Sequence, residues 1–263
     1  MKYAIYQMDV EVADPQANRE KIENWFKHTV AHDKPDTVVL PEMWNTSYAL
    51  DRLEGIADHD GKETIPFLRH LAKKYEVNII GGSVANQKAD GIYNSSFIFN
   101  REGEKVHQYD KMHLVPMLNE PEFLQGGKEK GEIFELDGIK MGIIICYDLR
   151  FPELMRSLAL KGAEVIHIVA QWPTARRTHW KHLIHARAIE NQCYIVSANS
   201  SGSCDGTNFA GESYIVGPSG DEVASGPSEQ EATIEAAIQL DKVEEIRKNI
   251  PVFTSRVADL YDL

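Results

Sequence analysis

Residues 140–153, KMGIIICYDLRFPE, join an expected strand to an expected helix through a cysteine. The apolar run at 140–145 predicts a buried strand, and Pro152 belongs to a residue type favoured in the first turn of a helix. Cys146 therefore stands at the end of a strand and directly before a helix. In α/β folds this is a place where a rigid sheet can aim a reactive side chain.

Strands and helices alternate on both sides of this stretch. The predicted strands cover residues 2–8, 37–40, 77–80, 93–99, 104–109, 133–136, 140–145, 164–170 and 194–198, with further short strands within 212–238. The predicted helices cover about 15–32, 64–76, a segment from 152 onward, 178–191 and 241–249. No internal repeat, linker or Gly-rich phosphate loop interrupts the pattern. We expect one α/β domain over residues 1–263 that ends in a short C-terminal tail.

The charge and composition of the chain narrow its partners. Its 263 residues carry a net charge of −12 without a basic cluster, which argues against nucleic acid and anionic membranes as partners. No run of about 18 apolar residues predicts a membrane span, and the first nine residues do not resemble a signal peptide. The three cysteines, an odd number without C-x-x-C spacing, favour free thiols in a reducing cytoplasm.

Three residues at strand ends form a chemically coherent set. Glu42 follows the strand at 37–40, and Lys111 follows the strand at 104–109. A carboxylate can take the proton of the Cys146 thiol, and an ammonium can hold the negative oxygen of a tetrahedral intermediate. Such a set would make an acyl-transfer site without histidine. The spacing of these residues also fits ordinary structural roles, in which Cys146 is a small buried thiol, Glu42 caps a loop and Lys111 is a solvated surface charge.

Three segments resemble the signature blocks of the nitrilase, or carbon–nitrogen hydrolase, superfamily. They are residues 40–44 (LPEMW), 109–114 (YDKMHL) and 145–153 (ICYDLRFPE), and they occur in the order of the family. The resemblance extends from the first strand to the final helix. It implies a four-layer α-β-β-α sandwich with two mixed β-sheets, usually paired into a homodimer across the helices that flank the nucleophile.

The resemblance also assigns roles to individual residues. It implies that Glu42 is the general base, Lys111 the cation that stabilises the oxyanion and Cys146 the nucleophile. The backbone N–H of Tyr147 would be the second oxyanion donor. Glu120 resembles the second glutamate of the family, which helps to position the lysine and the substrate; a solvated loop residue is the alternative for this position.

Within the family the sequence is most similar to the ω-amidase branch, which deamidates 2-oxo acids that carry a terminal carboxamide. A substrate with a carboxylate needs a cation, and Arg150 is the candidate, with an ion pair to Glu153 as the alternative. Tyr48 and Thr174 resemble residues that face the substrate, and Trp172 either walls the pocket or only packs. The bulky residues around Trp172 depart from the smaller ones of some ω-amidases, which leaves the substrate open.

Other functions stay open at this stage. Hydrolysis of an N-carbamoyl amine, a nitrile or a simple aliphatic amide uses the same mechanism. A catalytically silent member that binds a metabolite or a protein, a papain-like Cys–His enzyme and a domain that supplies ammonia to another enzyme are further alternatives. Neither a cofactor nor a metal is expected, although three histidines on one predicted helix are spaced so that two could lie near a metal: His179, His182 and His185.

Overall fold

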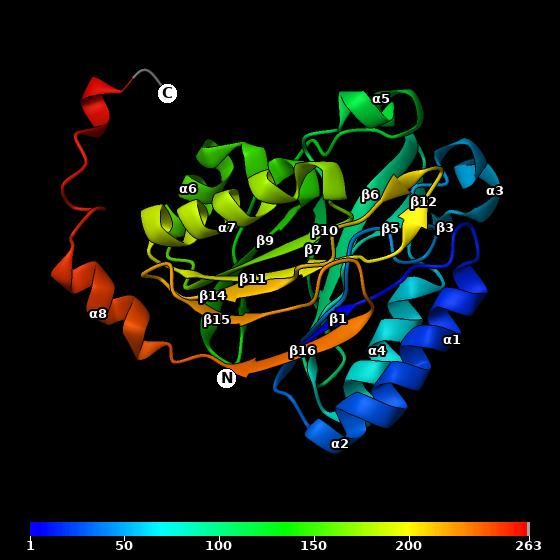
Figure 1. The fold of residues 1–263 in the computed structure, drawn as a ribbon, viewed down its shortest axis with the longest axis horizontal. Coiled ribbons are helices and arrows are strands. Elements are labelled where there is room, and N and C mark those ends of the chain that lie inside the picture. The colour runs from blue at the N-terminus through cyan, green and yellow to red at the C-terminus, as the bar shows by residue number, and fades with distance from the viewer. Residues whose placement is uncertain (262–263) are drawn as a thin grey trace.

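Two β-sheets pack face to face between two layers of helices in the computed structural model, which describes residues 1–261 (Figure 1). Helices α1 (Pro15–Trp25) and α4 (Thr64–Tyr75) cover the outer face of one sheet, and α6 (Pro152–Leu160) and α7 (Arg177–Asn191) cover the other. The expected four-layer α-β-β-α sandwich is confirmed. The last two residues of the predicted domain, 262–263, lie outside the described residues.

The first sheet is mixed and contains eight strands. Its order is β16-β1-β2-β4-β6-β5-β3, and β7 pairs with β6. The strands are β1 (Lys2–Gln7), β2 (Thr37–Val39), β3 (Asp58–His59), β4 (Asn78–Ile80), β5 (Val84–Lys88), β6 (Gly91–Phe99), β7 (Lys105–Asp110) and β16 (Ala232–Ala237). Strands β1, β2 and β4 run parallel, whereas β16 joins the edge next to β1 in the antiparallel direction.

The second sheet is also mixed and has the order β15-β14-β11-β10-β9-β8. Its strands are β8 (Phe134–Leu136), β9 (Ile139–Ile145), β10 (Val165–Ala170), β11 (Tyr194–Asn199), β14 (Tyr214–Val216) and β15 (Glu222–Ser225). Strands β9, β10 and β11 are parallel. A separate two-stranded ribbon joins β12 (Ser203–Cys204) to β13 (Thr207–Asn208).

Strand β1 shows why a nearly continuous apolar run suits this architecture. Tyr3 and Ile5 belong to the core that includes the residues between the two sheets. Ala4, Tyr6 and Met8 point to the other face, where they pack with the apolar side chains of α1 and α4. Since successive side chains of a strand alternate between faces, a strand covered on both sides is apolar at every position.

Most predicted elements are present within one or two residues of the expected bounds. The helix predicted over 15–32 begins after the Asp14 cap, whose carboxylate accepts the Ala17 N–H at 2.9 Å. It continues as a π-helical segment, η1 (Phe26–Val30), and α2 (Ala31–Asp33). Strands β3, β5, β12 and β13 were not predicted. Cys193 lies in the core, and Cys204 is buried in β12.

Several short elements and one further helix complete the chain. They are η2 (Leu50–Arg52), α3 (Leu53–Ile56), η3 (Pro116–Leu118), α5 (Glu120–Phe123), η4 (Cys146–Arg150), η5 (Thr174–Arg176), α8 (Asp241–Asn249) and η6 (Ala258–Leu260). Helix α8 and the segment after it extend away from the two sheets (Figure 1). Within residues 1–261, no helix combines the length and apolar character that crossing a membrane requires.

Candidate active site

The three residues predicted from strand ends meet at one edge of the sandwich. Glu42 follows β2 and Lys111 follows β7 in the first sheet, whereas Cys146 follows β9 in the second. The exposed fraction is 0% for Glu42 and Lys111 and 4% for Cys146. Lys111 Nζ lies 2.9 Å from Glu42 Oε1. The surface alternative for Lys111 is therefore wrong, because its ammonium is buried in an ion pair.

The two carboxylate oxygens of Glu42 have different numbers of donors. Oε1 accepts from Lys111 Nζ at 2.9 Å and Asn94 Nδ2 at 2.8 Å, and the Tyr48 hydroxyl lies 2.9 Å away. Among residues 1–261, Oε2 accepts only from the backbone N–H of Gln171, at 2.8 Å. A carboxylate offers about four lone-pair sites. Oε2 therefore retains an acceptor site, whereas Oε1 is saturated.

Glu120 is the second carboxylate that binds Lys111. Its Oε1 lies 2.7 Å from Lys111 Nζ, and its Oε2 accepts the Val115 N–H at 2.8 Å. The side chain is fully buried, so the solvated alternative for Glu120 is wrong. Burial lowers the pKa of Lys111, but the charges of Glu120 and Glu42 outweigh it and raise that pKa above its usual value. Lys111 is thus a permanent cation between two carboxylates.

The environment of Cys146 favours the neutral thiol. Burial raises the pKa of the thiol most, the charge of Glu42 raises it further, and Lys111 only partly offsets these effects. Two buried carboxylates face one ammonium in this cluster, so a thiolate would add a second uncompensated negative charge. A proton must therefore leave Cys146 as the sulfur attacks, and the free acceptor site on Glu42 can receive it.

The turn that carries Cys146 is held by a buried aspartate. Cys146 has a left-handed backbone, with φ +47°, at the junction of β9 and η4. Asp148 Oδ2 accepts from the Ile145 N–H at 3.0 Å and the Tyr109 hydroxyl at 2.7 Å. Its Oδ1 accepts the His113 N–H at 3.0 Å and lies 2.7 Å from His113 Nδ1. These contacts fix the strained turn, and Tyr147 lies in the first turn of η4, where N–H groups lack intrahelical acceptors.

The space in front of the sulfur, here called the Cys146 pocket, is narrow. Cys146, Tyr147, Arg150 and Trp172 contribute to its lining, and its free volume is about 20 Å³. The Arg150 guanidinium lies 4.7 Å from the Trp172 ring centre and 5.7 Å from the Tyr147 ring centre. Among residues 1–261, Arg150 forms no ion pair with Glu153, so that alternative is wrong. Trp172, 2% exposed, both walls the pocket and packs in the core.

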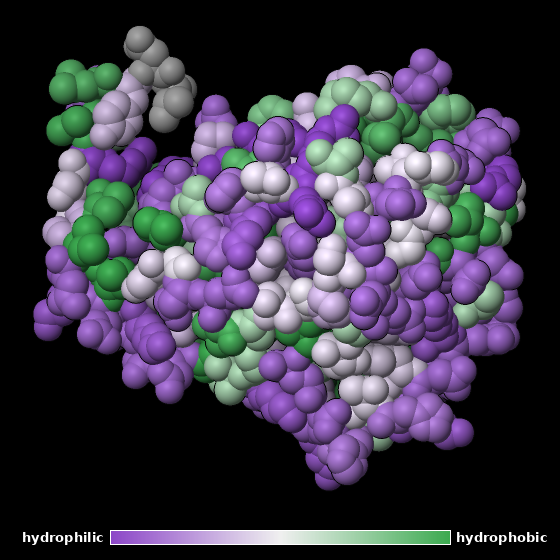
Figure 2. All heavy atoms as spheres, in the orientation of Figure 1, coloured by the Kyte–Doolittle hydropathy of each residue, from purple (hydrophilic) through white to green (hydrophobic). Residues whose placement is uncertain are grey.

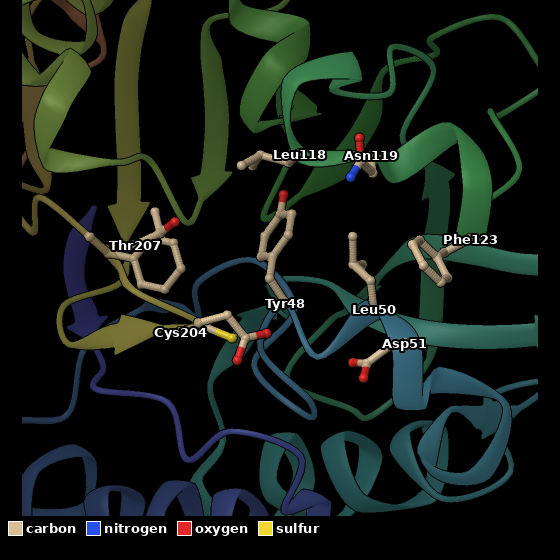
Figure 3. A pocket seen from close by; sticks show the side chains of 10 residues that line it. Tyr48, Leu50, Asp51, Leu118, Asn119, Phe123, Cys204 and Thr207 are labelled. Atoms are coloured by element: carbon tan, nitrogen blue, oxygen red, sulfur yellow. The ribbon is translucent and has the colours of Figure 1, made fainter.

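Two larger cavities flank the Cys146 pocket. The first, about 300 Å³, has Tyr48 on its wall and is drawn in Figure 3, where the labelled side chains come from three separate segments of the chain. The second, about 400 Å³, is lined by Thr174 and its neighbours in η5. Tyr48 thus reaches the buried cluster through its hydroxyl, whereas Thr174 lies outside the Cys146 pocket.

The family follows from a match along almost the whole chain. The family model described as carbon-nitrogen hydrolase matches residues 2–248. The chain belongs to the carbon–nitrogen hydrolase family. This hydrolase is 44% identical to "Hydrolase in agr operon" of Staphylococcus aureus, over 99% of the chain and 100% of that protein. It is 42% identical to "2-oxoglutaramate amidase" of Bacillus subtilis, again over 99% of the chain and 100% of that protein.

Solved structures agree with the fold of this hydrolase. The crystal structure of Saccharomyces cerevisiae NIT3, a member of branch 10 of the nitrilase superfamily, matches it with a TM-score of 0.90. The sequences are 29% identical, and the match covers 98% of this chain and 96% of the yeast chain. The family resemblance of the three sequence segments is therefore confirmed.

Three partners in the site of this hydrolase were missed by the sequence reasoning. Gln171 directly follows β10, so the argument from strand ends could have found it. Asn94 lies inside β6 and carried no sequence signal, whereas Asp148 lies two residues after Cys146, within the segment 145–153 that carries the family resemblance, but was given no role. His179, His182 and His185 do lie together on α7, but residues 1–261 contain no group of three or more side chains placed to hold a metal ion.

Proposed function

We propose that this hydrolase is an ω-amidase that deamidates small 2-oxo acid amides through a thioester on Cys146. The observation that carries the proposal is the buried cluster in which Glu42 keeps one free acceptor site beside a neutral thiol while Lys111 is fixed between two carboxylates. Such a cluster couples loss of the thiol proton to attack on a carbonyl. It supports the roles of general base for Glu42, nucleophile for Cys146 and oxyanion cation for Lys111.

In the first half of the reaction, the Cys146 sulfur bonds to the amide carbon while its proton passes to Glu42. The carbonyl electron pair moves to the oxygen, which Lys111 Nζ and the Tyr147 N–H stabilise. The Tyr48 hydroxyl is the longest of the three contacts of Lys111, at 3.3 Å, so it is the one that the oxyanion most readily replaces. Glu42 then returns the proton to the amide nitrogen as the intermediate collapses and the C–N bond breaks, so the nitrogen leaves as ammonia.

In the second half, Glu42 takes a proton from water as the water oxygen attacks the thioester. The C–S bond then breaks, the acid is released, and the sulfur regains its proton. Glu120 positions Lys111 in both halves, since it binds the same ammonium and is anchored by the Val115 N–H. No step requires a metal or an organic cofactor.

The proposed substrate class rests on the charge at the Cys146 pocket and on the relatives. Arg150, stacked on Trp172, offers a cation for the substrate carboxylate. Tyr48 and Thr174 are proposed as further substrate-binding residues on the two sides of the pocket. The 42%-identical relative named 2-oxoglutaramate amidase and the 32%-identical relative named Omega-amidase NIT3 support the same class.

We also propose one hydrolase domain, a homodimeric assembly and a cytoplasmic location. The family match over residues 2–248 supports the single domain followed by a tail. Apolar side chains gather at the end of the molecule formed by α8 and the C-terminal segment (Figure 2). Leu260 and Ile250 are 80% and 55% exposed there, and Ile189 of α7 is 53% exposed. Their burial between two copies would explain this exposure. Light scattering behind a sizing column tests the dimer.

Ammonia release from a substrate panel tests the activity. The panel holds 2-oxoglutaramate, 2-oxosuccinamate, an aliphatic amide, an N-carbamoyl amine and a nitrile, with Cys146→Ala as the blank. Release that depends on Cys146 and favours the 2-oxo amides is the expected result. Release only from the carbamoyl amine, nitrile or aliphatic amide would keep the mechanism and overturn the substrate class. A folded protein that binds these compounds without releasing ammonia would instead be a binding protein.

A further inference from the structure

The Cys146 pocket is too small for the proposed substrate on its own. Its free volume of about 20 Å³ is close to what one water molecule needs. An acyl chain of several carbons must therefore extend into neighbouring space. The pocket shares Leu118 with both flanking cavities, so the chain could leave toward either of them.

The two flanking cavities differ in charge. The cavity of about 300 Å³ is lined by Asp51 and Asp205 and by no lysine or arginine; we call it the acidic cavity. The cavity of about 400 Å³ is lined by Arg176 and, among the residues that the structure describes, by no aspartate or glutamate; we call it the Arg176 cavity. Arg176 and Pro173 line both this cavity and the Cys146 pocket, so the two adjoin. A carboxylate is repelled by the first cavity and attracted by the second.

Two side chains of the Arg176 cavity, Thr174 and Arg176, have no hydrogen-bond partner within the described part of the chain. The Thr174 hydroxyl oxygen is buried and without a hydrogen bond there. The Arg176 guanidinium likewise makes no hydrogen bond or ion pair with any residue from 1 to 261. Its backbone carbonyl, by contrast, accepts the indole N–H of Trp172 at 2.9 Å. One indole therefore anchors the turn of Arg176 while its ring supports Arg150.

We propose that Arg176 and the Thr174 hydroxyl form a subsite for the carboxylate end of the substrate, in the Arg176 cavity. This inference rests on the proposed function and extends it. The amide carbon lies at Cys146, Arg150 lines the Cys146 pocket beside Lys111, and Arg176 adds a further cation at the outer end of the acyl chain. The subsite selects amides that carry a negative charge away from the scissile bond, and the acidic cavity rejects the opposite placement.

The test compares Arg176→Gln with Arg177→Gln, since Arg177 is an exposed arginine one position further along the chain. Each variant is assayed with 2-oxoglutaramate and with pentanamide, a neutral amide of equal chain length. The measured quantity is the kcat/KM for 2-oxoglutaramate divided by the kcat/KM for pentanamide. We expect Arg176→Gln to lower this ratio by roughly 10- to 100-fold, mainly because the KM for the charged amide rises. Arg177→Gln should leave this ratio unchanged, and Arg176→Lys should restore part of it.

Thr174→Val, which removes the hydroxyl at nearly equal volume, is a second variant if Arg176→Gln does not fold; a several-fold drop in the same ratio is expected. Equal ratios in Arg176→Gln and Arg177→Gln would overturn the subsite, as would equal losses on both amides. If the wild-type protein releases no ammonia from 2-oxo amides, the proposed function fails instead, so the two failures are distinguishable.

Discussion

Replacing Glu42 with glutamine should affect turnover and thiol reactivity in opposite directions. The glutamine oxygen can occupy the place of Oε1 and keep the donors from Lys111, Asn94 and Tyr48. Its amide nitrogen then takes the place of Oε2, where it faces the N–H of Gln171 and has no lone pair for the thiol proton. The proposed base is lost while most of the hydrogen-bonded framework remains.

The magnitude follows from the absence of a substitute base among the described residues. Glu42 raises the pKa of Cys146 through its charge and a side-chain hydrogen bond, whereas Glu120 acts on the thiol through its charge and is held by Lys111 and the Val115 N–H. General-base catalysis contributes roughly 10²- to 10⁴-fold in rate, which corresponds to about 3–5 kcal/mol of barrier. We expect kcat to fall by that factor. In the variant, the new amide NH2 faces the N–H of Gln171, so two donors meet without an acceptor. This costs about 1–3 kcal/mol of folding free energy, which leaves the protein folded.

Thiol reactivity gives the second readout. Burial raises the pKa of Cys146 most, and the charge of Glu42 is the next cause, so Glu42→Gln should lower that pKa. Lys111→Met should raise it, because Lys111 is the group that lowers it. The assay follows iodoacetamide alkylation against pH by intact mass, with Cys146→Ala as the control for the other thiols. A Glu42→Gln variant that keeps a tenth of wild-type kcat, or whose alkylation shifts to higher pH, would refute the reasoning.

Three further predictions follow from buried groups. Asp148→Asn should lose two of the four hydrogen bonds of this side chain, so the free energy of unfolding in urea should fall by about 3–6 kcal/mol and ammonia release should be lost. The control is Asp58→Asn, which loses one of its two hydrogen bonds and should keep activity. In Gly82→Ala, the new Cβ would lie 2.1 Å from the carbonyl oxygen before Glu42 at φ +61°, so we expect more than about 2 kcal/mol of destabilisation and reduced kcat. Gly138→Ala, with no atom within 4 Å, should cost about 1 kcal/mol and leave kcat intact. Burial lowers the pKa of His167 to about 4, so as the pH falls the unfolded chain binds a proton at this residue before the folded chain does. The free energy of unfolding should therefore decrease between about pH 6.5 and pH 4, by up to about 3 kcal/mol. A His167→Gln variant that shows the same decrease in urea titrations would contradict this.

The helices and strands that form the four layers could be predicted from the sequence because burial imposes a periodic pattern of apolar residues. Strands covered on both faces, such as β1 and β9, appear as apolar runs, and the amphipathic α4 appears as a helical repeat. Strand β5 was missed because its residues, Val84–Lys88, combine a small and two amide side chains that lack this pattern. The two-residue strands were missed because so short a segment has no periodicity.

The site was only partly predictable for a different reason. Glu42, Lys111 and Cys146 share the property of following a strand, but spacing alone could not separate them from ordinary residues, and the family resemblance was needed. Asn94 and Asp148 act through hydrogen bonds to groups 52 and 39 residues away. Such contacts depend on the packing of separate segments, which no local sequence pattern reports.

The charge balance of the buried cluster explains how Cys146 could act as the proposed nucleophile without a histidine as its base. A resting thiolate would react with any electrophile that reaches it, whereas a protonated thiol is far less reactive. Burial and the charge of Glu42 are the largest causes that keep the Cys146 thiol protonated, and the second carboxylate, Glu120, adds to them and makes the cluster net negative. In the proposed mechanism, the sulfur becomes nucleophilic only as Glu42 accepts its proton and a carbonyl oxygen takes up the negative charge beside Lys111. On this argument Glu120→Gln should increase alkylation of Cys146 at neutral pH while it decreases ammonia release. A variant in which both rates fall together would show that Glu120 acts only by positioning Lys111.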